Sequence, residues 1–179
     1  MAKLFWKKAN PPPWLEKLGW RIEAGMLGAL WLVVKPMSPI KAASTGRMFM
    51  GWLGPRLNKH KHVKANLRIA CPEKTSQEIE QLAISSWGNV GAVLAELAHT
   101  DKLTDRQVTE PAIEVVNQNK DEAFTAHKKP CIFIAAHLGN WEMSGFAIEV
   151  FGYPVDVVYS PFANIYLENM VQKSRAPMR

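Results

Sequence analysis

The 179-residue sequence is poor in the residues and segments that mark secreted and metal-binding proteins. Its two cysteines, Cys71 and Cys131, lie far apart, so neither a disulfide framework nor a zinc site is indicated. No Asn-x-Ser/Thr glycosylation site occurs, and the N-terminus lacks the apolar core and cleavage site of a secretory signal peptide. These absences predict a protein that is not exported, keeps both thiols reduced, and uses no metal or cofactor.

Acidic residues are scarce in the first part of the chain. Residues 1–70 contain 13 lysines and arginines but only two acidic residues, whereas residues 71–179 contain nine and 14. Five of the seven tryptophans also fall within residues 1–70, interleaved with basic residues. Tryptophan rings and long basic side chains both suit the headgroup region of an anionic membrane. We therefore expect residues 1–55 to form a basic, tryptophan-rich membrane anchor, followed by a second domain over residues 56–179.

No apolar run in the chain reaches the ~20 residues that a spanning helix needs. The best candidate, residues 24–34, has eleven, and Arg21 and Glu23 precede it. Prolines on both sides predict one helix over residues 14–34. We interpret this helix as an interfacial or shallowly inserted anchor. A tilted span with a snorkelling Arg21 and a buried helix of a soluble domain are the alternatives.

The most basic run of the chain covers residues 56–68 and ends before Cys71-Pro72. It predicts a helix that is solvated or faces phosphate groups. His60 and His62 lie within this run, but no nearby cysteine, aspartate or third histidine completes a metal site. Nucleic-acid binding is disfavoured because no aromatic residues that could stack on bases interleave with the run.

A capping box predicts the start of the next helix. Thr75 and Glu78 have the Thr-x-x-Glu spacing in which each side chain satisfies a free amide of the other's backbone. Apolar residues of helical period continue from there to about His99. Glu96 and His99 stand three positions apart, a spacing so common on helix surfaces that we give it little functional weight.

Beyond residue 112, short apolar runs alternate with helical stretches, which is typical of a parallel sheet with crossover helices. The predicted strands are residues 113–116, 131–136 and 155–159, and helices are predicted over residues 141–151 and from Asn164 onward. The continuous run CIFIAA at residues 131–136 predicts a central strand that is buried on both faces. The predicted fold class is therefore α/β, with N-terminal membrane-associated helices followed by a partial, mostly parallel sheet.

The candidate for chemistry is the segment HLGNWE, residues 137–142, directly after CIFIAA. In open α/β sheets, the carboxyl ends of strands and the following helix starts form the ligand crevice. Gly139 allows a tight turn there, and Asn140 suits the N-cap of the next helix. Glu142 can reach back toward His137, accept from Nδ1–H and leave Nε2 as the basic nitrogen. This arrangement can deprotonate a substrate hydroxyl that attacks an acyl group.

A purely structural role for the same residues is an open alternative. His137 can be a polar residue at a strand end, and Glu142 can be an acid that favours the first turn of a helix. The His-x4-Glu spacing alone does not separate these readings. The apolar run before the histidine and the Gly-Asn pair within the segment favour function.

In order and spacing, several segments resemble the lipid A biosynthesis acyltransferases of Gram-negative bacteria, a branch of the glycerolipid acyltransferases. They are the WLVV anchor, HKHVKANLRIACPE, QEIEQLAISSWGNVGAVLAELA, the HLGNWE box and VVYSPFANIYLENMVQKSR. The resemblance implies a glycerolipid acyltransferase-like fold at the cytoplasmic face of the inner membrane. It also implies an acyl-acyl carrier protein as the donor and a hydroxyl of a lipid A precursor as the acceptor.

The resemblance also implies roles for individual residues. His137 is the expected general base and Glu142 its orienting acid, an HX4E motif. The expected substrate-binding residues are Gly139, Asn140, Tyr159, Asn164 and Arg175. Arg175 is expected to contact a phosphate or carboxylate, because its planar fork suits these groups. By position alone, a solvated cation in the last helical turn is an equal alternative.

Two departures from the family pattern motivate an alternative function. The family usually has Tyr-Arg-Pro where this chain has Tyr159-Ser160-Pro161, so a cation expected near an anionic substrate is absent. Family members also continue with further strands beyond the position of Arg179, so we expect residues 56–179 to be the N-terminal portion of an α/β domain. The alternative function is that of a truncated, catalytically inert, membrane-associated homologue or fragment.

Overall fold

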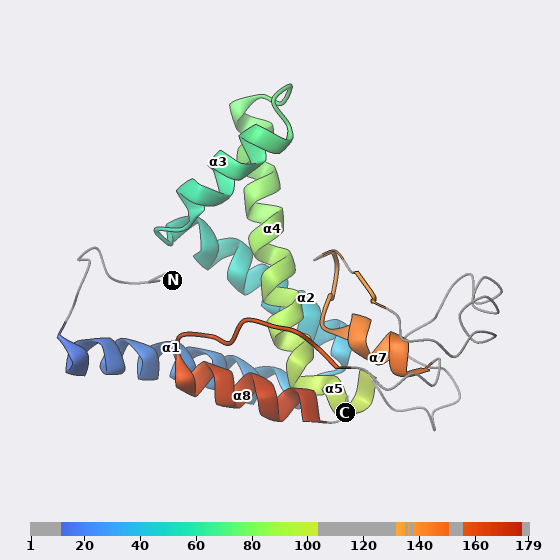
Figure 1. Cartoon of the computed structure of the whole chain (residues 1–179). Coiled ribbons are helices and arrows are strands. Elements are labelled where there is room, and N and C mark those ends of the chain that lie inside the picture. Colours follow the sequence, from blue (N-terminus) through green and yellow to red (C-terminus); the bar gives the residue numbers. More distant parts are fainter. Residues whose placement is uncertain (1–11, 104–131, 135, 137, 151–155, 177–179) are drawn as a thin grey trace.

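The chain, seen in a computed structural model, is an assembly of helices around one long helix, α4 (Figure 1). The structure describes residues 12–103, 132–134, 136, 138–150 and 156–176. Within these ranges the helices are α1 (Pro13–Val34), α2 (Pro39–Leu53), α3 (His60–Ala70), α4 (Ser76–Glu96), α5 (Thr100–Leu103), α7 (Met143–Val150) and α8 (Ile165–Arg175). Two short 3-10 turns, η1 (Gly54–Arg56) and η2 (Leu97–His99), extend α2 and α4.

The predicted first helix is confirmed as α1, which begins at Pro13 and ends at Val34. Proline suits the first turn of a helix because its missing N–H would have no intrahelical partner there. Among the described helices, none combines the length and apolar character needed to cross a membrane. At the C-terminal end of α1, the Val34 carbonyl lies 3.0 Å from Nε2 of the buried His99. Because a carbonyl only accepts, this ring nitrogen of His99 carries the hydrogen.

Helices α2 and α4 cross in close contact, which small residues make possible. A Cβ atom added to Gly46 of α2 would lie 2.1 Å from the Gly91 carbonyl oxygen of α4, and the reverse distance is also 2.1 Å. Near this crossing, the end of α1 completes a small buried core, which consists of Val34, Ala42, Ala95 and Ala98. The backbones of α2 and α4 therefore touch where glycine leaves room for them.

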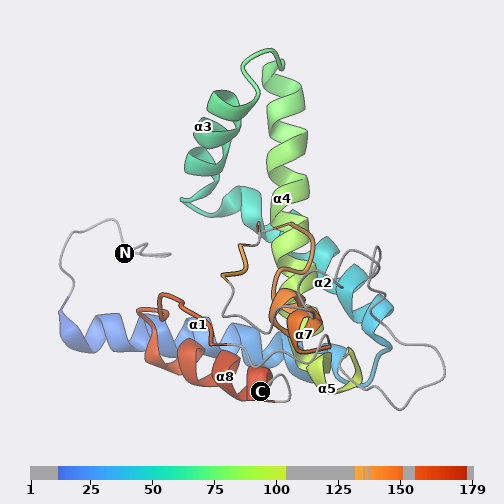
Figure 2. The ribbon, with the colours of Figure 1, turned by 45° about the vertical axis from the view of Figure 1, so that its right-hand side comes forward.

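Helices α3 and α4 form a hairpin that extends away from α1 and α8 (Figures 1 and 2). The predicted capping box is present at the start of α4, where Thr75 and Glu78 exchange side-chain and backbone hydrogen bonds. Buried His60 of α3 accepts at Nδ1 from Trp87 Nε1 (3.2 Å), because an indole N–H only donates. His60 Nε2 therefore carries the hydrogen and donates to Glu80 at 2.8 Å.

The predicted α/β fold is wrong for the part of the chain that the structure describes, where no strand or sheet is present. Ile132 and Ile134 of the expected central strand are 92% and 94% exposed, and Val158 of the last expected strand is fully exposed. A β-branched apolar run favours the extended backbone, but a strand forms only with a hydrogen-bonded neighbour. The described residues of these two runs form no strand. The expected strand at residues 113–116 lies outside them.

Helix α8 confirms the helix predicted from Asn164, and it lies alongside α1 (Figures 1 and 2). Asn164 is its N-cap, since its Oδ1 accepts from the backbone N–H groups of Tyr166 and Leu167. The helix predicted over residues 141–151 is observed as α7, from Met143 to Val150. Helix α8 is thus packed against α1 and against η2 at the end of α4.

Candidate functional site

Residues 138–142 of the HLGNWE segment form the turn that leads into α7. His137, the expected general base, lies outside the described residues. Gly139 has a φ of +55°, a left-handed conformation in which glycine carries no steric penalty. Asn140 Oδ1 accepts from the Glu142 backbone N–H at 3.2 Å, and α7 then begins at Met143. Local chemistry thus explains both the tight turn and the helix start that follows it.

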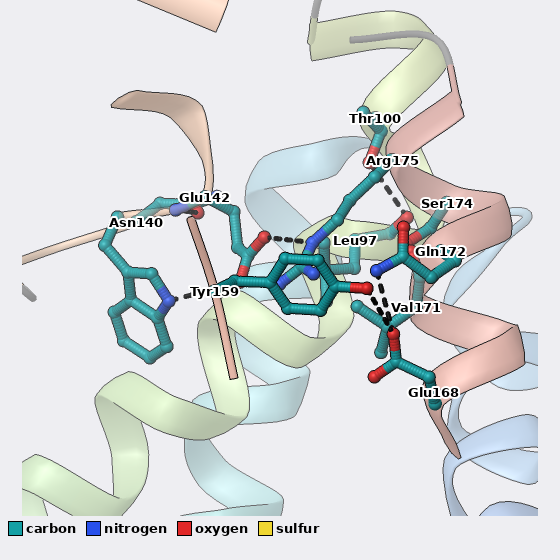
Figure 3. A network of polar contacts seen from close by, with 11 residues as sticks. Leu97, Thr100, Asn140, Glu142, Tyr159, Glu168, Val171, Gln172, Ser174 and Arg175 are labelled. Atoms are coloured by element: carbon teal, nitrogen blue, oxygen red, sulfur yellow. Dashed lines mark hydrogen bonds and ion pairs between the residues drawn. The ribbon is translucent and has the colours of Figure 1, made fainter. Parts of the chain in front are cut away.

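The carboxylate of Glu142 is held by Arg175 of α8 in a bidentate ion pair (Figure 3). Arg175 Nε donates to Oε2 and Nη2 donates to Oε1, each at 2.8 Å. The two side chains are only 12% (Glu142) and 22% (Arg175) exposed, and Trp141 Nε1 adds a bond to Oε1 at 3.1 Å. The hydrogen bonds to Glu142 raise the pKa of Arg175 despite its partial burial. Both residues were predicted as site residues from the sequence, but the ion pair between them was not.

Tyr159 and Glu168 continue this network along α8. The Tyr159 hydroxyl donates to Glu168 at 3.0 Å, and the guanidinium of Arg175 lies 5.7 Å from the centre of the Tyr159 ring. The backbone N–H of Phe162 also donates to Glu168, at 2.9 Å, and it is the main reason why the pKa of Glu168 is lowered. Figure 3 shows Tyr159 pointing toward the glutamate. Tyr159 and Arg175, both expected substrate-binding residues, therefore lie close together.

Asn164, another expected substrate-binding residue, is buried at the contact between α8 and α1. Its Nδ2 donates to the Trp20 carbonyl at 2.9 Å and to the Glu23 carboxylate at 3.0 Å. The Nδ2 atom of the amide therefore donates to α1, while its Oδ1 atom caps the start of α8. The contacts of Asn164 in the structure are therefore those that attach α8 to α1.

Helix α4 supplies two contacts to the turn that sequence reasoning missed. Asn89 Nδ2 donates to the Gly139 carbonyl at 3.1 Å, and Glu96 Oε2 accepts from Asn140 Nδ2 at 2.6 Å. Burial raises the pKa of Glu96, and the bond from Asn140 opposes this shift only in part. The spacing of seven positions places Asn89 and Glu96 on one helix face, but no sequence signal identified the turn as their partner. His99, three positions further on, bonds instead to the end of α1.

A shallow groove of about 600 Å³ lies beside this site, between α1, the end of α4 and α8. Its lining is mainly apolar, with Trp31 and Leu97 on its walls and Lys35 and Lys173 among its polar groups. No residue of the HLGNWE turn is among the described residues that line it. No cluster of three or more histidine, cysteine, aspartate or glutamate side chains suited to a metal ion occurs within the described ranges.

Comparison with known families places the chain among the acyltransferases. Residues 20–179 match the family described as bacterial lipid A biosynthesis acyltransferase. The match spans most of the sequence, so the chain belongs to this family, as its motifs predicted. No curated protein and no solved structure matches the chain.

Proposed function

We propose that the chain transfers a fatty acyl group from an acyl-acyl carrier protein thioester to a hydroxyl of a lipid A precursor. His137 Nε2 takes the hydroxyl proton while the oxygen attacks the thioester carbonyl carbon. The carbon–sulfur bond then breaks, and the proton on His137 passes to the departing thiolate of the carrier. The family match over residues 20–179 is the observation that carries the proposal.

The fixed position of Glu142 supports a role in orienting His137. A carboxylate offers about four lone-pair positions to donors. Arg175 and Trp141 provide three hydrogen bonds to Glu142, which leaves acceptor capacity for an imidazole Nδ1–H. A carboxylate that is already held by two other residues can orient an imidazole ring without a further loss of its own side-chain entropy.

Replacing the general base is the direct test of this mechanism. We expect His137→Ala to lower acyl transfer at least about 100-fold, because a positioned base contributes 10²–10⁴-fold to such reactions. Transfer is measured by mass spectrometry of the precursor after incubation with acyl-acyl carrier protein. His62→Ala, which removes an exposed histidine of α3, is the control and should retain the full rate. Normal transfer by His137→Ala would refute the assignment.

A catalytically inert membrane-associated protein is the second candidate function. It is favoured by Ser160, which replaces the cation of the family motif, and by the exposed apolar segments 132–134 and 157–158. The two candidates differ in one measurement, since the inert protein gives no acylated product even with an unchanged His137. A wild-type chain that binds membranes but never acylates the precursor supports this second candidate.

For location, we propose the cytoplasmic face of the inner membrane, with α1 lying on the lipid surface. Exposed apolar side chains recur every four residues along α1, at Trp14, Leu18, Ile22 and Met26. Lys17 and Arg21 are exposed and flank this stripe, three positions after Trp14 and Leu18, and Arg21 also donates to the Tyr166 hydroxyl of α8 at 3.4 Å. An apolar stripe with flanking cations suits the interface of an anionic bilayer. The basic charge of residues 1–70 also complements an acidic carrier protein.

Two acidic substitutions on this face test the location. We expect Leu18→Glu with Ile22→Glu to lower binding to phosphatidylglycerol vesicles at least about tenfold, because charge is costly at the apolar boundary. Gln77→Glu with Gln81→Glu on α4 introduces the same charge at exposed positions and is the matched control. Sedimentation with vesicles at two salt concentrations measures the binding. Equal losses in both double variants would show that net charge alone drives association.

A further inference from the structure

Two side chains of α4 reach the turn between residues 138 and 142 from one face of the helix. Asn89 and Glu96 are seven positions apart, which places them about two turns apart on the same side. Asn89 contacts the backbone of Gly139, and Glu96 contacts the side chain of Asn140. The turn is thereby attached at two successive residues to α4, which packs against α2 and α3.

The hydrogen bonds fix which way the Asn140 amide faces. A backbone N–H only donates, so the atom of Asn140 that meets the Glu142 N–H must be the oxygen. The amide nitrogen then faces Glu96, which must offer an acceptor oxygen. At 2.6 Å the contact is as short as a charge-assisted hydrogen bond. Glu96 therefore stabilises one orientation of the Asn140 amide. In that orientation the amide oxygen accepts from the backbone N–H of Glu142.

We propose that Glu96 and Asn89 are positioning residues of the acyl-transfer site. They fix the backbone of residues 139–142, which include Glu142 and follow His137 closely in the sequence, whereas Arg175 of α8 fixes the Glu142 carboxylate. The proposal rests on the function proposed above, in which this turn presents the general base. Neither α4 residue touches the reacting atoms in this role; each acts through the turn.

The chemistry of residue 96 provides matched variants. Glu96→Gln keeps an acceptor oxygen for Asn140 and removes the charge, whereas Glu96→Ala removes the acceptor. We expect Glu96→Ala to lower kcat about 10- to 100-fold with KM for both substrates nearly unchanged, because small displacements of catalytic groups have effects of this size. Glu96→Gln should restore most of kcat. Gln81→Ala, an exposed substitution on the same helix, is the control.

Hydrogen exchange provides a second measurement that needs no turnover. Because Asn140 shields the Glu142 amide, Glu96→Ala should speed exchange of that N–H at least about tenfold relative to wild type, and Glu96→Gln should not. Thermal unfolding of each variant is the control, because an unchanged melting temperature shows that the faster exchange is local. Loss of kcat in Glu96→Gln equal to that in Glu96→Ala would overturn the proposal.

The outcomes separate this proposal from the proposed function. If His137→Ala abolishes transfer while Glu96→Ala keeps kcat and normal exchange at Glu142, the function stands and the positioning role is refuted. If the wild-type chain does not turn over, the exchange measurement alone decides. Faster exchange in Glu96→Ala, restored in Glu96→Gln, then supports positioning of the turn, and unchanged exchange refutes it.

Discussion

Gly91→Ala is expected to be strongly destabilising. The new methyl group would lie 2.1 Å from the Gly46 carbonyl oxygen and 2.6 Å from Met50 Cβ. Backbone atoms of α2 cannot move aside as a flexible side chain can, so the two helices must separate. Overpacking commonly costs about 1–3 kcal/mol, and a backbone clash belongs at or above the upper end of that range. Urea unfolding followed by circular dichroism measures the loss.

Gly25→Ala is the matched control for this substitution. Gly25 lies within α1, and a Cβ atom added there has nothing within 4 Å. Alanine should therefore stabilise the protein by up to about 1 kcal/mol, because glycine is the poorer helix former. If Gly91→Ala and Gly25→Ala shifted the urea midpoint in the same direction, close backbone contact between α2 and α4 would not describe the folded protein.

Arg175→Met should cause the second large loss of stability, because it leaves the Glu142 carboxylate without its charged partner. The two side chains are mostly buried and share two hydrogen bonds of 2.8 Å. Removing one partner of such a pair costs on the order of 3 kcal/mol. Replacing both partners, as Arg175→Met with Glu142→Gln, leaves no buried charge and should recover part of this loss. A double-mutant cycle in urea gives the coupling energy.

Lys173→Met is the control for the arginine substitution, since Lys173 is an exposed cation two positions earlier on α8. It should change the free energy of unfolding by less than about 0.5 kcal/mol. The same variants should differ in acyl transfer, because only Arg175→Met releases the Glu142 carboxylate. Additive effects of Arg175→Met and Glu142→Gln on stability would contradict a shared ion pair.

Helices were predictable where a local signal marks an end. Prolines fix the start of α1, Thr75 and Glu78 form the predicted capping box of α4, and Asn164 caps α8. Each signal works through backbone groups within four residues, so it does not depend on the rest of the fold. The family was also readable from the sequence, because it rests on the order and spacing of motifs.

The sheet could not be predicted reliably from the apolar runs near residues 132 and 157. Such runs report a preference for extended backbone and apolar surroundings, but a sheet depends on partners distant in the sequence. In the described residues Ile132, Ile134 and Val158 of these runs are exposed and no strand is formed, which local propensity cannot foresee. The eventual neighbours of a β-branched run are a property of the whole fold.

In the candidate site, too, local features were predictable from the sequence and long-range partners were not. Gly139 has the turn conformation that its residue type predicts, Asn140 accepts from the Glu142 N–H within the turn before α7, and Glu142 and Arg175 were selected as charged site residues. The partner of each charge was not predictable, because Glu142 and Arg175 are 33 positions apart and belong to different helices. The α4 contacts from Asn89 and Glu96 were missed for the same reason.

The sequence by itself determined the family, most helix boundaries and the residues of the HLGNWE turn, since these depend on motif order and on interactions within a few residues. Only the tertiary structure decided that α4 and α8 hold this turn from two sides and that α2 crosses α4 at paired glycines. Those contacts join segments far apart in the chain, and their geometry depends on how the helices pack rather than on any local pattern.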